Sequence, residues 1–277
     1  MLHICLVQIF EKEPERVIIE CEEDVKYPTE NEDNLIFQVC KAFSPNLPLG
    51  FHIKVKNEIP MGRGLGSSGA AIVGGILLAI LLDSINSTES SSNNHCCTVS
   101  FNEILRVAYQ FENHFDNIGP SLTGGLVSAF SSASHQNFRL NCFQISKAFQ
   151  THIQAFALIP QNTQTATKEA RGIVSRSLPL DRHIDSMQKA FTLVSLISHD
   201  DDDDEDEEFE GSEFVSHMQS CLWENFVHMR QRVDLIQENG WEALKVMDRV
   251  LQDSNVGYLG TTISGSGPTI LLFQASY

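Results

Sequence analysis

The sequence predicts an α+β protein with two domains. Segments of alternating apolar and polar residues, which are typical of strands, occur along the chain together with segments that have the period of amphipathic helices. A chain of 277 residues, 42% of them hydrophobic, is long enough to bury two cores. The most distinctive segment is a strand, a glycine-rich loop and an apolar helix over residues 51–82.

The elements of the first half are predicted from their apolar periods and from the residues at their ends. Phe51, Ile53 and Val55, for example, alternate with polar residues and indicate a strand. In chain order we expect strands at Leu2–Phe10 and Arg16–Cys21, a helix capped by Asp33 or Asn34 that stops before Pro45, a strand from residue 51, a helix to Leu82, a Ser- and Asn-rich surface loop at Ser84–Thr98, a helix opened by the capping box of Ser100 and Glu103 that ends near Glu112, a loop at Asn113–Pro120 and a strand at Leu126–Phe130.

The second half contains fewer strand signals and more helical ones. In chain order we expect a strand at Ile153–Ile159 ended by Pro160, a short helix at Thr165–Val174, a longer amphipathic helix around Ile184–Val194, a disordered acidic loop, helices at about Glu224–Glu238 and Trp241–Gln252, and a strand, glycine turn and strand over Gly260–Ile270.

Charge and composition exclude several classes of function. The net charge is −17, and nine acidic residues form one run from Asp200 to Glu208, so no basic patch is available for nucleic acid. The longest apolar run, Ala70–Leu82, is shorter than the roughly 20 residues that span a bilayer. Seven cysteines without CxxC spacing indicate a reducing compartment, with neither a disulfide framework nor a zinc site, and we expect a cytoplasmic protein.

The glycine-rich loop has the features of a phosphate site. Pro60 ends the strand, three glycines alternate with other residues, and Ser67 or Ser68 can cap the helix that follows. Unpaired N–H groups and the helix dipole favour an anion at such a helix start. A flexible turn before a core helix is the alternative, but the paired serines and the long apolar segment favour the phosphate site. The loop lacks the Gly-Lys-Ser/Thr of a Walker A motif and fits the dinucleotide fingerprint poorly.

The segment from Pro60 to Ala71 resembles the phosphate loop of the GHMP superfamily of small-molecule kinases, and it is most similar to that of homoserine kinases of the fungal type. The resemblance implies the two-domain GHMP kinase fold, with an ATP-binding domain at 1–148 like domain 2 of ribosomal protein S5, a ferredoxin-like domain at 149–277 with an acidic insert at 199–213, and an active site in the cleft between them. The residues it implies for ATP binding are Pro60, Met61, Gly62, Arg63, Gly64, Leu65, Gly66, Ser67, Ser68, Gly69 and Ala70.

In this family a loop serine and a glutamate before a His-Pro-Asp-Asn motif hold Mg²⁺. The resemblance therefore implies Ser68 and Glu112 as metal ligands, which agrees with the preference of Mg²⁺ for few protein oxygens. Taken without the family context, Glu112 is a solvated residue at a helix end.

The same motif implies residues near the acceptor. Asp116 and Asn117 would lie by the hydroxyl as a weak base or an orienting partner, and His114 would contact the substrate. Phe115 departs from the family pattern, which has proline there, and the geometry of this loop is therefore an open question.

Arginine binds a carboxylate through two parallel hydrogen bonds, which suits an amino-acid substrate. The resemblance implies this role for Arg171 and Arg232, with Arg230 as a rival for the second position. Surface salt bridges on helices are the alternative for each of them.

Ser264, Gly265 and Gly267 resemble the third superfamily motif, whose glycine turn packs beside the phosphate loop. A plain tight turn between two strands is the alternative. The family also has a first strand with a Pro-x-Ser-x-Asn segment and a closing helix and strand, which this sequence lacks, so we expect a chain truncated at both ends.

The resemblance implies ATP-dependent phosphorylation of the L-homoserine hydroxyl in threonine biosynthesis. One alternative is a truncated or non-catalytic relative that binds a ligand or a partner, and another is a related kinase with a different substrate such as mevalonate. We expect ATP and a small molecule as partners, a homodimer as the candidate assembly, and neither nucleic acid nor a membrane.

Overall fold

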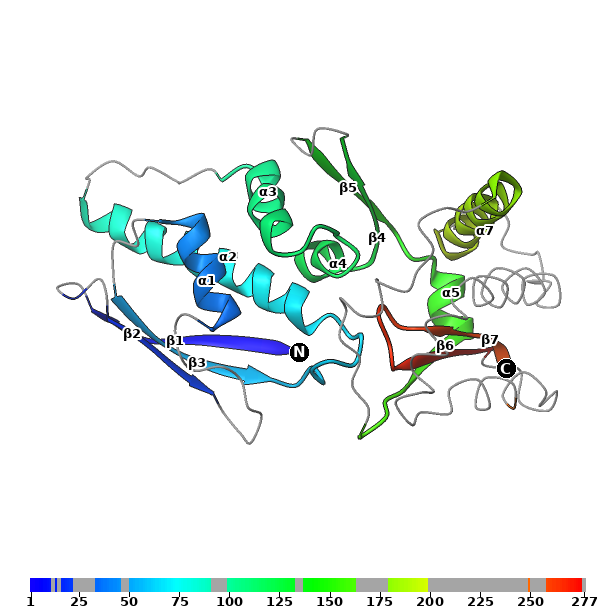
Figure 1. Cartoon of the computed structure of the whole chain (residues 1–277), viewed down its shortest axis with the longest axis horizontal. Helices are drawn as coiled ribbons and strands as arrows, with labels where there is room; N and C mark the ends of the chain where they lie inside the picture. Colours follow the sequence, from blue (N-terminus) through cyan, green and yellow to red (C-terminus); the bar gives the residue numbers. More distant parts are fainter. Residues whose placement is uncertain are drawn as a thin grey trace. The chain divides into compact units, whose positions relative to one another are not determined.

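The computed structural model describes residues 1–10, 13, 16–21, 33–45, 50–90, 99–132, 137–162, 179–198, 249 and 258–275. The chain divides into two compact units, whose elements are labelled in Figure 1. The first unit contains Met1–Pro60 and Gly66–Cys142, and the second contains Met61–Leu65 and Phe143–Tyr277. The boundary expected at residue 148 falls inside helix α5 (Lys147–His152).

The first unit is built on a three-stranded sheet of order β1-β3-β2. Strand β3 (Gly50–Asn57) lies in the centre, antiparallel to β1 (Leu2–Phe10) and parallel to β2 (Val17–Cys21). All three strands were predicted, and the alternation is clearest in β3, where Phe51, Ile53 and Val55 are buried.

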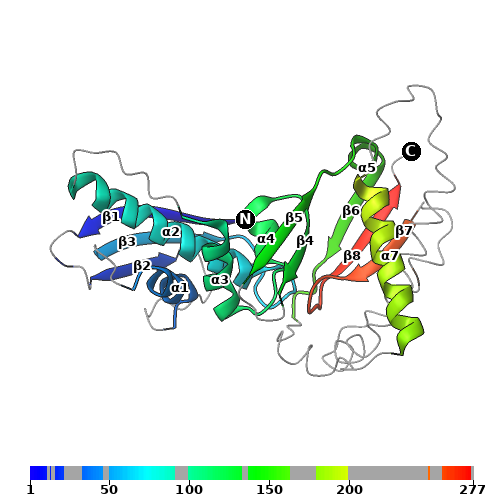
Figure 2. The same cartoon turned by 90° about the horizontal axis from the view of Figure 1, so that it is seen from above.

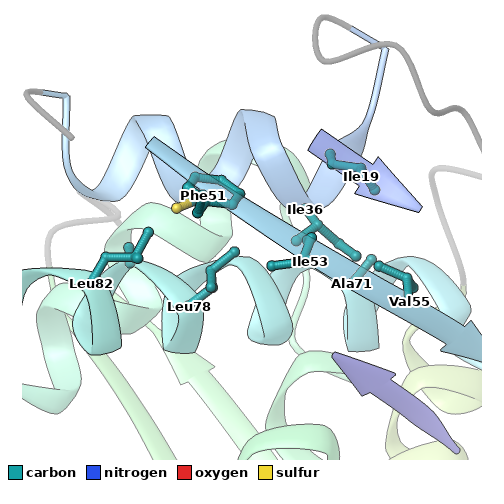
Figure 3. Close-up of a cluster of buried hydrophobic side chains, with 10 residues drawn as sticks. Ile19, Ile36, Phe51, Ile53, Val55, Ala71, Leu78 and Leu82 are labelled. Carbon is teal, nitrogen blue, oxygen red and sulfur yellow. The ribbon is translucent and has the colours of Figure 1, made fainter. Parts of the chain in front are cut away.

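Helices α1 (Leu35–Phe43) and α2 (Ser67–Ser90) pack their apolar sides on one face of this sheet, as Figure 3 shows. Phe51 and Ile53 of β3 are fully buried there, together with Ile36 of α1 and Leu82 of α2. Each such side chain contributes about 1.5–3 kcal/mol through burial. A Cβ on Gly75 of α2 would lie 2.6 Å from the Ile36 carbonyl oxygen, so glycine lets the two helices approach closely.

The predicted helix caps are formed by Asn34, whose Oδ1 accepts from the Phe37 amide at 3.2 Å, and by Ser100, whose Oγ accepts from the Glu103 amide at 3.2 Å. The prediction of a loop from Ser84 was wrong for its first part, because α2 continues to Ser90. The Ser84 hydroxyl donates to the Ile80 carbonyl inside the helix, which satisfies this polar side chain without a loop.

A second layer of the first unit packs on α2. It consists of α3 (Phe101–Phe111) and α4 (Ile118–Thr123), and a hairpin of β4 (Leu126–Ser131) and β5 (Phe138–Phe143) follows. The prediction of a loop through Pro120 was wrong at its end, because α4 begins at Ile118. Strand β5 was not predicted.

The second unit has an antiparallel sheet of order β6-β8-β7, formed by Ile153–Leu158, Ile270–Ala275 and Tyr258–Ile263. Helices α5 and α7 (Leu180–Ser198) pack on this sheet, where Phe149, Leu193 and Leu196 surround the buried Leu259 (Figure 2). The helices expected at 165–174, 224–238 and 241–252 and the acidic run lie outside the described residues, apart from the single helical position 249.

Helix α2 is apolar enough to resemble a membrane span. Its segment Ser67–Asn86 has a mean hydropathy of 2.0 over 20 residues, longer than the apolar run recognised in the sequence. Half of that segment is buried inside the protein, and core helices of water-soluble proteins meet the same criterion. By itself, this helix is weak evidence for a membrane.

Candidate functional site

The first part of the glycine-rich loop belongs to the second unit. Gly62 and Gly64 have φ angles of 65° and 75°, a region that favours glycine. The Ser264 hydroxyl donates to the Gly64 carbonyl at 2.8 Å, and a Cβ on Gly64 would lie only 2.1 Å from the Ser264 carbonyl oxygen. The glycine turn of Ser264, Gly265 and Gly267 therefore packs directly against Gly64.

Arg63 joins the same part of the loop to two residues of the second unit, one just before strand β8 and one just after strand β6. Its carbonyl accepts from the Thr269 amide at 3.3 Å, and its Nη2 donates to the Gln161 carbonyl at 2.5 Å. Its other terminal nitrogen, Nη1, is buried and has no hydrogen-bond partner among the described residues. One donor of this guanidinium is therefore available for an added anion.

The second part of the loop begins helix α2 in the first unit. Gly66, at φ 76°, precedes the helix, and its carbonyl accepts from the Ala70 amide. The prediction that Ser67 or Ser68 caps the helix was wrong, because both are its first residues. The glycine takes the position before the helix and frees both hydroxyls for other partners.

Those hydroxyls contact two polar residues of the first unit. Ser67 Oγ accepts a hydrogen bond from the side-chain nitrogen Nδ2 of Asn57 at 3.3 Å, and Ser68 Oγ donates to Oε1 of Glu112. The second carboxylate oxygen of Glu112 is buried and has no hydrogen-bond partner among the described residues. A hydroxyl and a carboxylate in contact, with one carboxylate oxygen unused, fit the hard oxygen ligands of Mg²⁺.

The described chain has no group of three or more His, Cys, Asp or Glu residues that could hold a metal. Mg²⁺ does not require such a group, because it takes few protein ligands and completes its shell with phosphates and water. Ser68 and Glu112, which contact each other, could hold such an ion.

The loop after Glu112 brings a further side chain to the start of α2. A Cβ on Gly66 would lie 3.0 Å from Asn117 Oδ1, and a Cβ on Gly69 would lie 2.8 Å from Asn117 Cβ. His114 Nδ1 contacts Asp116 Oδ1 in the same loop. Within the first unit, Ser68, Glu112 and Asn117 thus gather around the first turn of α2.

A glycine-rich loop before a helix start, with a carboxylate in contact with the first turn, can bind a phosphate group and a metal ion. Residues 34–125 match the family model of the GHMP kinases N terminal domain. Over this third of its length the chain is similar to the GHMP kinases.

The relatives that this chain resembles over most of its length include homoserine kinases. One from Clostridium botulinum is 28% identical over 245 residues, covering 87% of this chain and 69% of that protein. One from Persephonella marina is 28% identical over 263 residues, covering 94% of this chain and 74% of the relative. The crystal structure of homoserine kinase from Cytophaga hutchinsonii has a TM-score of 0.64 at 20% identity, covering 99% of this chain and 76% of that one. The expected α+β GHMP kinase fold is confirmed.

Not every predicted site residue can be placed. Arg171, Arg232 and Arg230 lie outside the described residues. Asn57 and Gln161 were missed by the sequence analysis. Asn57 is the last residue of β3, directly before the loop, and this position was the only signal in the sequence that pointed to it.

Proposed function

We propose that this chain is a homoserine kinase, which transfers the γ-phosphoryl group of ATP to the hydroxyl of L-homoserine and gives O-phospho-L-homoserine for threonine biosynthesis. The observation that carries the proposal is the contact of Ser68, at the start of α2, with Glu112. It joins a phosphate-binding helix start to a metal-binding carboxylate. The homoserine kinases among the relatives support the choice of substrate.

The loop and helix start hold the nucleotide phosphates in this proposal. The first N–H groups of α2 have no partners inside the helix and point outward, and the helix dipole adds partial positive charge. The unpaired Nη1 of Arg63 adds a charged donor from the loop itself. Bound Mg²⁺ would neutralise phosphate charge and orient the phosphates.

The residues after Glu112 act on the acceptor in the proposed reaction. The bond from the γ-phosphorus to its bridging oxygen breaks, a bond to the homoserine hydroxyl oxygen forms, and the hydroxyl proton leaves to Asp116 or to solvent. Asn117 orients the hydroxyl by a hydrogen bond, and His114 contacts the substrate. Asp116 is 57% exposed, so it remains open to a small molecule from solvent.

Arg171 and Arg232 bind the homoserine carboxylate in this proposal, each through two parallel hydrogen bonds. We also propose a cytoplasmic location. The homodimer stays a prediction.

The test is ³¹P NMR of the 277-residue chain with Mg²⁺ and ATP, with and without homoserine and with mevalonate as a second acceptor. A phosphate-ester signal that depends on homoserine supports the proposal. A folded protein that gives no ester signal, or gives one only with mevalonate, overturns it. Replacing Arg171 by alanine should raise the KM for homoserine at least about tenfold, since a charged hydrogen-bonded pair is lost. The exposed Arg139 supplies the control, because R139A should leave that KM unchanged.

A further inference from the structure

Phe115 is the one buried residue of the segment Glu112–Asn117, with 5% of its surface exposed. Its ring packs edge-on against Phe138 of β5, with ring centres 5.0 Å apart, and lies 5.7 Å from the ring of Tyr109 on α3. Tyr109 and Phe138 are themselves 5.1 Å apart. The three rings form an aromatic cluster, a name used below for Tyr109, Phe115 and Phe138.

The two neighbours of Phe115 are both more exposed than Phe115 and contact each other. The side chain of His114 is 18% exposed and that of Asp116 is 57% exposed, and Nδ1 of His114 contacts Oδ1 of Asp116. Phe115 is therefore the buried residue between these two side chains, and its burial anchors the backbone that carries both of them.

The backbone of Phe115 is fixed as well. Its carbonyl accepts from the Gly119 amide at 2.8 Å, which joins the segment to the first turn of α4. Asn117 lies between these two bonded residues and packs against Gly66 and Gly69 of the phosphate loop and α2. Glu112, on the other side, ends α3 and has its amide bonded to the Ala108 carbonyl at 3.1 Å.

We propose that Phe115 is the positioning residue of the segment Glu112–Asn117. Its ring, held between Tyr109 and Phe138, keeps the Glu112 carboxylate on Ser68, Asn117 on the start of α2, and His114 with Asp116 on the open side. Phe115 itself touches no substrate. The proposal deepens the proposed kinase function and rests on it for the roles of Glu112, Asp116 and Asn117.

The chain offers a matched control for the test. Phe138 belongs to the same cluster and is 6% exposed, but it lies on β5 and outside the segment. F115L and F138L each remove one ring from the cluster, so we expect a similar fall in Tm. We expect F115L to lower kcat at least tenfold and to raise the Mg²⁺ concentration for half-maximal rate, whereas F138L, which alters one wall of the cluster but leaves Phe115 in the segment, should change both values clearly less.

A second readout needs neither nucleotide nor turnover. Hydrogen exchange of the amides of residues 112–117 in the free protein should accelerate at least tenfold in F115L and clearly less in F138L. If F115L does not fold, the milder F115M takes its place in the same comparison.

Equal kinetic and exchange effects in the two variants would show that the ring only fills the core, and the proposal would be overturned. Failure of the proposed function looks different. In that case the wild-type chain phosphorylates no homoserine, while the hydrogen-exchange comparison still decides whether Phe115 positions the segment.

Discussion

Replacing Gly64 by alanine tests the geometry of the phosphate loop, and Gly124 supplies its control. Both glycines have a positive φ, 75° at Gly64 and 71° at Gly124, so alanine brings about 1–3 kcal/mol of backbone strain at either position. The space around them differs. A Cβ on Gly124 would meet nothing within 4 Å, whereas a Cβ on Gly64 would lie 2.1 Å from the Ser264 carbonyl oxygen and 2.7 Å from the Gly267 amide nitrogen.

The size of the effect follows from these distances. Ordinary contact begins at 3.4 Å, so the loop or the glycine turn must move by about 1 Å to admit the Gly64 methyl group, since both clashing atoms belong to the backbone. A misplacement of about 1 Å at a reacting centre can cost roughly 10²-fold in rate. We therefore expect kcat of G64A to fall roughly 10²-fold and its ATP affinity to fall at least about tenfold, or about 1.4 kcal/mol.

The assay combines urea unfolding, ATP binding by calorimetry and turnover with homoserine for both variants. G124A should lose about 1–3 kcal/mol of unfolding free energy and keep its turnover. If G64A binds ATP and turns over like G124A, the packing of Gly64 on the Ser264 turn does not position the loop, and the reasoning is refuted.

Three further predictions concern single side chains. E112Q should lose at least about 10²-fold in turnover and its response to Mg²⁺, while E103Q, exposed on the same helix, should stay near wild type in a Mg²⁺ titration. S264A removes the hydrogen bond to the Gly64 carbonyl, which contributes about 1 kcal/mol, so ATP affinity should fall about fivefold by calorimetry; an unchanged affinity counts against that contact. Burial, together with the nearby charge of Asp83, raises the pKa of the Cys40 thiol from 9.0 to about 12. As the pH rises, the unfolded chain therefore loses this proton before the folded chain does. The stability that the protonated thiol contributes is present in full below pH 9 and declines at higher pH. The unfolding free energy of the wild type relative to C40A should therefore drop by about 1.4 kcal/mol between about pH 8 and about pH 10, and no change in that difference would contradict the pKa shift.

Local signals explain why much of the fold could be predicted. Asn34 and Ser100 each place a side-chain acceptor at the start of an apolar period, and both helices begin there. Strand β1 was predicted from alternation alone, because its sheet has one covered face. Strand β5 was missed although its residues alternate: Phe138 and Leu140 pack into the core, and Arg139 and Asn141 between and beside them are exposed.

The candidate site depends on contacts that no local pattern contains. Gly64 and Ser264 are 200 residues apart, and Ser68 and Glu112 are 44 apart. Their motifs were recognised separately, and the resemblance to a family suggested that they meet. The hydrogen bond from Arg63 to the Gln161 carbonyl, which joins residues 98 positions apart, could not be predicted in this way, because every residue has a backbone carbonyl and the sequence does not indicate which one accepts.

The three glycines of the loop look alike in the sequence and have nearly the same φ, but their surroundings give them different roles. Gly64 faces backbone atoms of another segment, which cannot yield without moving a strand turn. Gly66 faces the end of the Asn117 side chain at 3.0 Å, which can rotate away by a few tenths of an ångström. The sequence pattern therefore indicates where the backbone needs a positive φ. Whether a position can accept a side chain depends on whether the atom that an added Cβ would meet belongs to the backbone or to a side chain. For this loop that distinction makes Gly64 the position at which the geometry is fixed by packing, and Gly66 the position at which the loop adjusts to Asn117.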